Sequence, residues 1–88
     1  MNFTWHDTKR KTNLAKHGLD FAEAGQVFSG PTATVEDRMY GNEQRFNTTR
    51  LLDIKVVVIT HTETEDEIRI ISKREAEKHE IKEFFSYL

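Results

Sequence analysis

Residues 55–72 read KVVVITHTETEDEIRIIS, with two apolar runs on either side of an acidic stretch. The run from Val56 to Ile59 is unbroken, which is typical of a β-strand that is covered on both faces and lies centrally in a sheet. EIRIIS, residues 67–72, predicts a second strand, and the acidic residues between the two runs predict a hairpin turn. We therefore expect a sheet with residues 56–59 at its centre.

Two earlier segments also have strand character, residues 32–39 (TATVEDRM) and 43–52 (EQRFNTTRLL). Turns at residues 40–42 and 53–54 would connect them to the central strand. This order of strands and turns predicts an antiparallel meander. A further short strand is expected at residues 2–5, near the N-terminus.

Two helices are expected before the meander, on one side of the sheet. Asp7 should cap the first, over residues 8–17. Asp20 and Glu23 resemble a capping box, which would open the second helix over residues 20–28. Together with the strands, these helices predict an α+β fold.

A C-terminal helix should follow the last strand. Ser72 and Glu75 have the spacing of a capping box, so the helix would start there. Its apolar stripe follows the helical period and consists of Ile81, Phe84, Phe85 and Leu88.

The composition indicates one small domain over residues 1–88. Hydrophobic residues make up 36% of the chain, enough for a core despite 32% charged residues. The chain has no Cys, which excludes a disulfide framework or a Cys-based zinc site. No segment approaches the ~18 to 20 apolar residues of a membrane span, so we expect a cytoplasmic protein without membrane contact. The net charge of -2 requires any nucleic-acid site to be a local basic cluster.

Arg69 interrupts the apolar run of the last strand and raises the question of an anion site. Strand alternation alone would make it an ordinary outward-facing residue on a half-solvated sheet. Arg45 in the meander and Arg74 beyond the strand could join it in one site, since guanidinium groups contact phosphate bidentately. Ser72 would fit this site because a helix N-terminus offers free N–H groups, although capping alone also accounts for it.

The histidines and carboxylates do not form a recognisable metal site. His17 should lie in the last turn of the first helix, before Gly18, where the helix dipole favours a protonated imidazole. By itself it could equally be a surface or capping residue. No HExxH or comparable ligand set occurs, and neither does a glycine-rich phosphate loop or a nucleophile elbow. We therefore expect neither a metal nor a cofactor.

Three stretches of the chain resemble the BrnT toxins of bacterial type II toxin–antitoxin systems. They are FTWHDTKRKTNLAKHGLDFAEAGQVF (residues 3–28), NEQRF (residues 42–46) and IRIISKREAEKHEIKEF (residues 68–84). The resemblance implies a RelE-like fold, with two N-terminal helices packed on an antiparallel sheet and a C-terminal helix. It also implies a ribonuclease that blocks translation until a BrnA-type antitoxin neutralises it. The resemblance further implies that the complex is a heterotetramer built on an antitoxin dimer, and that operator DNA is contacted only through the antitoxin.

The candidate residues suit metal-independent RNA cleavage, in which the ribose 2′-OH attacks the adjacent phosphorus. Such a site needs a base, cationic donors for the developing charge and an acid for the leaving oxygen. We assign proton transfer to His17, charge stabilisation to Arg69 and Arg74, and phosphate positioning to Arg45. The substrate-binding candidates are Lys16, Ser72 and Glu43, with Lys16 as a substitute acid and Glu43 as an alternative base.

Two interpretations without RNA cleavage remain open at this stage. The domain could be a non-catalytic module that docks an antitoxin and acts as a co-repressor. It could also be a poison of RelE/ParE-like fold that binds DNA gyrase. The acidic balance of the chain favours a module, whereas the Arg and His residues favour a nuclease.

Overall fold

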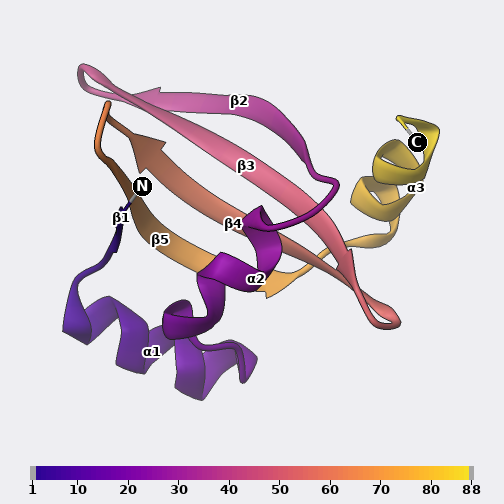
Figure 1. Ribbon diagram of the computed structural model, residues 1–88, viewed down its shortest axis with the longest axis horizontal. Helices are drawn as coiled ribbons and strands as arrows, with labels where there is room; N and C mark the ends of the chain where they lie inside the picture. The colour runs from indigo at the N-terminus through magenta and orange to yellow at the C-terminus, as the bar shows by residue number, and fades with distance from the viewer. Residues whose placement is uncertain (1, 88) are drawn as a thin grey trace.

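The computed structural model describes residues 2–87 and contains a five-stranded sheet with helices before and after its long strands (Figure 1). In chain order the elements are β1 (Asn2–Thr4), α1 (Asp7–His17), the 3-10 helix η1 (Phe21–Glu23), α2 (Ala24–Phe28), β2 (Ala33–Tyr40), β3 (Glu43–Leu52), β4 (Lys55–Glu63), β5 (Glu67–Glu75) and α3 (Lys78–Ser86). The strands are arranged in the order β1-β5-β4-β3-β2. The predicted α+β class is confirmed.

The expected central strand is confirmed. β4 is the middle strand of the sheet, and Val56 is the most exposed of its four apolar residues 56–59, at only 7%. Val57 and Ile59 face the main core, while Val56 and Val58 are buried on the other face. A continuous β-branched run therefore lies where both faces exclude water.

The main core lies between the sheet and the N-terminal helical segments. Figure 1 shows α1 and α2 near each other on one side of the molecule, with α3 apart from them. The buried core residues are Phe21, Ala24, Val27, Val57, Ile59, Ile68 and Ile70. Burial of one such large apolar side chain contributes about 1.5 to 3 kcal/mol, so these residues fix η1 and α2 against the sheet.

The expectation of a wholly antiparallel sheet is wrong for one strand. β2 to β5 form the antiparallel meander, but β1 pairs in parallel with β5, Phe3 opposite Ile68. The helical segment after β1 carries the chain to the far edge of the sheet before the meander begins. A three-residue strand has no sequence feature that specifies its partner.

The expected N-terminal helices differ from the structure in their caps and continuity. His6, not Asp7, is the N-cap of α1, and Asp7 lies in the first turn, where a negative charge is favourable. The second helix is divided into η1 and the five-residue α2. Asp20 accepts a hydrogen bond from the Ala22 N–H at 3.0 Å, but Glu23 does not complete a capping box.

The largest correction concerns the start of the C-terminal helix. β5 continues to Glu75, so Ser72 lies within a strand and caps nothing. α3 starts at Lys78, and its capping box is formed by Glu77 and Glu80, which repeat the same spacing five residues later. The cross-strand partners on β4 satisfy the backbone groups up to Glu75, and this pairing overrides the local capping signal.

The apolar stripe of this helix is only partly buried. Phe84 packs inward at 3% exposure, whereas Phe85 is 48% exposed. Ile81 is half-buried. Leu88, the last residue of the predicted stripe, lies outside the described residues.

Candidate active site

A β-bulge on β5 places three predicted site residues on one face of the sheet. Arg69 lies opposite Thr62, Ser72 opposite Thr60 and Arg74 opposite Val58. Directly opposed residues project to the same face, and these three β4 partners are two residues apart, so Arg69, Ser72 and Arg74 all project to the face opposite the main core. The register shift between Thr60 and His61 leaves one extra residue on β5, without which residues 69 and 72 would project to opposite faces.

β3 adds two further candidates to this face, which we call the polar face. Asn47 lies opposite Thr60, so Glu43 and Arg45 project to the same side by strand alternation. The polar face is thus formed by Glu43, Arg45, Asn47, Thr60, Thr62, Arg69, Ser72 and Arg74.

Glu43 lies between two of the arginines. Its Oε2 accepts a hydrogen bond from Arg69 Nη2 at 2.6 Å, and its Oε1 lies 3.4 Å from Arg45 Nε. The Arg69 hydrogen bond, with a smaller effect of Arg45, lowers the pKa of the Glu43 carboxyl. A carboxylate with a lowered pKa is a weak proton acceptor, so this environment suits orientation of the two guanidinium groups better than general-base catalysis.

Arg45 is also held by an aromatic ring. Its guanidinium lies 3.7 Å from the ring centroid of Tyr40, a cation–π contact. The side chain of Arg45 is only 19% exposed. Ring and carboxylate together restrict Arg45 to one orientation.

Arg74 is paired with the C-terminal helix instead. Its Nη1 and Nη2 donate to the two carboxylate oxygens of Glu80 at 2.7 and 2.9 Å. This pair raises the pKa of Arg74 and lowers that of Glu80. Glu80 also accepts from the Glu77 N–H at 2.9 Å, so one carboxylate both caps α3 and orients Arg74.

The single anion site of three arginines is therefore not formed. Arg45 and Arg69 share Glu43, whereas Arg74 turns toward Glu80. At roughly 3.3 Å per residue, the Cα atoms of Arg69 and Arg74 lie about 16 Å apart along β5. The polar face thus has two separate cationic positions with Ser72 between them in sequence.

The remaining candidates lie in a groove beside β5. Lys16 and His17, at the end of α1, line a cavity of about 280 Å³ together with Ser72 and Ile71 of the bulge. We call this the α1 groove. Ser72 belongs to both the polar face and the α1 groove, and it is the residue at which they meet.

A buried amide attaches α1 to β5 and keeps the groove in place. Asn13 donates to the carbonyl oxygen of Lys73 at 2.8 Å and accepts from the Lys73 N–H at 3.1 Å. The Lys73 side chain is itself buried and donates to the Asp20 carbonyl at 3.1 Å, while burial lowers its pKa. These bonds position His17 relative to the bulge.

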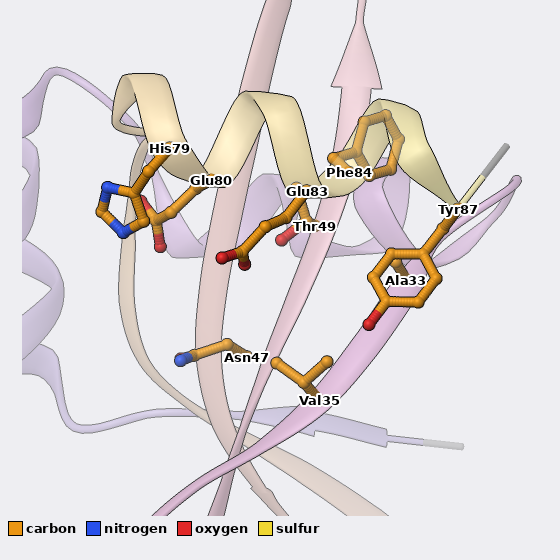
Figure 2. A pocket seen from close by; sticks show the side chains of 9 residues that line it. All are labelled: Ala33, Val35, Asn47, Thr49, His79, Glu80, Glu83, Phe84 and Tyr87. Atoms are coloured by element: carbon orange, nitrogen blue, oxygen red, sulfur yellow. The ribbon is translucent and has the colours of Figure 1, made fainter.

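A second cavity, of about 170 Å³, lies between α3 and the strands β2 and β3. Figure 2 shows Glu83 and Tyr87 of α3 directed toward the strands that carry Val35 and Asn47. Glu80 also lines it, so this cavity adjoins the Arg74 ion pair.

Sequence reasoning missed the site contributions of Tyr40 and Glu80. Tyr40 was assigned to a turn, and its contact with Arg45 depends on the β2–β3 hairpin register. Glu80 follows Glu77 at capping-box spacing, so this pair was visible in the sequence. The predicted capping box, and with it the start of the helix, had been placed at Ser72 and Glu75 instead.

Within residues 2–87, no group of three or more His, Asp or Glu side chains is arranged to hold a metal ion. In the same range, no helix is both long and apolar enough to span a bilayer.

Two comparisons relate this arrangement to known proteins. A family model described as the ribonuclease toxin BrnT of type II toxin–antitoxin systems matches residues 5–80. Among solved structures, the 1.1 Å crystal structure of the Brucella abortus ribonuclease toxin BrnT is similar, with a TM-score of 0.67 and 25% sequence identity. That match covers 89% of this chain and 99% of the Brucella chain. No curated protein matches the chain in sequence.

Proposed function

Since the chain belongs to the BrnT family of type II toxin–antitoxin ribonuclease toxins, we propose that it cleaves RNA without a metal, at the polar face of its sheet. Membership of this family implies an antitoxin partner and an RNA target. The residue roles and the reaction are our proposal.

The proposed reaction starts with attack of the ribose 2′-oxygen on the adjacent phosphorus. His17 takes the 2′-OH proton as general base, and Lys16, which lines the same groove, supplies the proton to the departing 5′-oxygen as general acid. Arg69 stabilises the charge that develops on the phosphorane oxygens, and Arg45, which shares Glu43 with it, positions that phosphate. Arg74, farther along β5 and paired with Glu80, binds another phosphate of the same RNA strand. The new bond joins the 2′-oxygen to phosphorus while the bond to the 5′-oxygen breaks, which leaves a 2′,3′-cyclic phosphate and a 5′-hydroxyl.

The observation that best supports this proposal is the position of the Glu43 carboxylate between Arg69 and Arg45. A carboxylate held by two guanidinium groups marks a place where an anion is favoured, and a phosphate has the same preference for bidentate donors. Arg69 keeps its other N–H groups for a ligand, because its interaction with Glu43 uses Nη2. Arg69 lies on the polar face, opposite the core, so packing of the core does not account for an arginine at this position.

The cellular consequences follow from the same proposal. Cleavage of RNA would inhibit translation in the cytoplasm, and a BrnA-type antitoxin would neutralise the toxin. A RelE-like classification of the fold is part of this proposal, on the grounds of an antiparallel meander flanked by N-terminal helical segments and followed by α3.

The proposal is tested by incubating the purified protein with RNA in the presence of EDTA and analysing the ends of the products. We expect cleavage to persist and to yield 2′,3′-cyclic phosphate ends. Expression without antitoxin should arrest growth in parallel. Growth arrest with intact RNA would contradict the nuclease proposal and favour a poison that acts by binding, such as a gyrase inhibitor.

A further inference from the structure

Two lysines of α1, Lys9 and Lys16, line a cavity beside the sheet. On the polar face, Glu43 is paired with Arg45 and Arg69, and Glu80 with Arg74. By contrast, Lys9, Lys16 and His17 all line the α1 groove, which has no carboxylate in its wall. Within residues 2–87, neither Lys9 nor Lys16 forms an ion pair. The local basic cluster that an acidic chain needs for binding a polyanion is thus in this groove.

The cations extend along the groove. The α1 residues that line it recur at three- and four-residue spacing on one helix face, and they are Thr8, Lys9, Thr12, Asn13, Lys16 and His17. With a rise of ~1.5 Å per residue, Lys9 and Lys16 are about 10 Å apart along the helix. Two amines at this separation suit a ligand with several anionic groups better than a single small anion.

The groove is continuous with the polar face at the bulge. Ser72 projects to the polar face opposite Thr60, and it also lines the α1 groove beside Ile71. A strand of nucleic acid that crosses the polar face past Ser72 would therefore continue along α1.

We propose that the α1 groove binds the phosphodiester backbone of the RNA next to the scissile phosphate, with Lys9 as a substrate-binding residue. This inference rests on the proposed ribonuclease function and extends its site by a helix face. Lys9 is exposed, so its amine can contact a phosphate without any rearrangement of the fold. Its contribution to binding is its positive charge. The hydroxyl of Thr12 donates to the Thr8 carbonyl at 2.9 Å, so it does not supply the groove with a free donor.

The experiment compares two single-lysine variants of the full chain, Lys9→Ala and Lys11→Ala. Both residues are exposed on α1, and both substitutions remove one charge and introduce the same helix former. Lys11 lies on the side of the helix opposite the groove and does not line it. The two variants therefore differ only in which side of α1 loses its charge.

Binding is measured with a fluorescent oligoribonucleotide in which every 2′-oxygen is methylated, so that the nucleophile is blocked and no cleavage occurs. Affinity is determined over a range of salt concentrations. For Lys9→Ala we expect affinity to fall several-fold, and the slope of log K against log salt to become shallower by about 0.7, the value for one lost phosphate contact on a single strand. For Lys11→Ala we expect a change of less than about twofold, since it makes no such contact.

The outcomes separate this inference from the proposed function. If the wild type cleaves unmodified RNA but the two variants bind the methylated strand equally well, the groove proposal is wrong while the nuclease proposal stands. If Lys9→Ala alone weakens binding but the wild type leaves RNA intact, the groove proposal stands and the nuclease proposal fails. If the wild type neither binds nor cleaves, both are wrong.

Discussion

At the scale of single residues, the candidate site depends on how carboxylates orient arginines. Glu43 holds Arg69 and Arg45, and Tyr40 covers Arg45 with its ring. Charged hydrogen bonds of this kind restrict a long side chain to one orientation and so reduce the entropy lost when a ligand binds. Arg69 is the residue for which this orientation matters most, because it lies on the polar face and keeps free donors.

Replacement of Arg69 by Ala should reduce RNA cleavage by about 10²-fold or more, by comparison with loss of one oxyanion donor. Arg69→Lys should not restore full activity, because an ammonium lacks the planar pair of donors. The measurement is single-turnover cleavage with chelator present, with circular dichroism to show that both variants are folded. A folded Arg69→Ala variant that cleaves as fast as the wild type would make Arg69 an ordinary outward-facing strand residue.

His61 is a buried residue whose protonation should control stability in mild acid. Its ring is fully buried, stacked on Phe46 and in edge contact with Phe28, and its Nε2 lies 2.7 Å from the Thr48 hydroxyl. Burial lowers the pKa of His61 from 6.5 to about 4. The unfolded chain therefore takes up a proton near pH 6.5, before the folded protein does.

Stability should accordingly be full above pH 6.5 and fall by about 3 kcal/mol as the pH drops toward 4, given a pKa lowered from 6.5 to about 4. The lowered pKa values of Asp20, Glu43 and Glu80 start from 3.8, 4.5 and 4.5, so the contributions of these carboxylates are lost only from about pH 4.5 downward, at the acid end of that window. Urea unfolding between pH 7.5 and 4.5 measures the effect. His61→Phe keeps the aromatic contacts and should flatten the pH dependence of the unfolding free energy. An equally steep loss of stability in this variant would show that another group is responsible for the pH dependence.

At the scale of secondary-structure elements, α3 is attached through few buried groups. Phe84 is its one buried residue within the described chain, and the Arg74–Glu80 pair connects the first turn to β5. Because Glu80 also completes the capping box, the start of the helix and the orientation of Arg74 depend on the same carboxylate.

Glu80→Gln separates these two roles. A Gln side chain can keep the capping hydrogen bond but loses the charge that pairs with Arg74. We expect a loss of about 1 kcal/mol in unfolding free energy, near the value of one net hydrogen bond, and a larger relative loss of RNA cleavage, because Arg74 is no longer oriented. Thermal unfolding and cleavage kinetics are measured on the same samples.

Glu83→Gln is the matched control for this variant. Glu83 is exposed on the same helix, lines the adjoining cavity and, within residues 2–87, forms no ion pair. Glu83→Gln should leave the unfolding free energy and the rate of RNA cleavage unchanged. Increased cleavage by Glu80→Gln would mean that Glu80 competes with the substrate for Arg74, contrary to an orienting role.

At the scale of the whole molecule, apolar residues remain exposed at one edge of the sheet and on α3. Val35, Met39 and Tyr40 are exposed on the edge strand β2, and Phe85 and Tyr87 on α3. Unpaired edge strands and exposed apolar side chains are common where another chain docks.

Co-expression with the antitoxin gene should therefore yield a stable complex. We expect two copies of this 10.3 kDa chain on an antitoxin dimer, with a mass that light scattering after gel filtration can establish. A toxin that elutes alone as a monomer beside its antitoxin would contradict this assembly.

The amino-acid sequence was sufficient to predict the parts of the fold that depend on local pattern. The apolar run at residues 56–59 predicted the buried middle strand, and the turns around it predicted the meander of β2 to β5. The first helix was correctly expected to end at residue 17, and Gly18, which follows it, has a φ of 70° in the left-handed region that glycine adopts readily. These features succeed because hydrophobic period and backbone preference act within a few residues of chain.

Other features depend on contacts between distant residues, and no local pattern specifies them. The parallel pairing of β1, the bulge that aligns Arg69 with Ser72, and the extension of β5 through Arg74 all follow from hydrogen bonding between strands. The choice of Glu43 and Glu80 as arginine partners likewise depends on register and on where α3 starts. At Ser72, a local capping signal competed with a row of cross-strand hydrogen bonds, and the strand prevailed because pairing with β4 satisfies more backbone groups than one cap can.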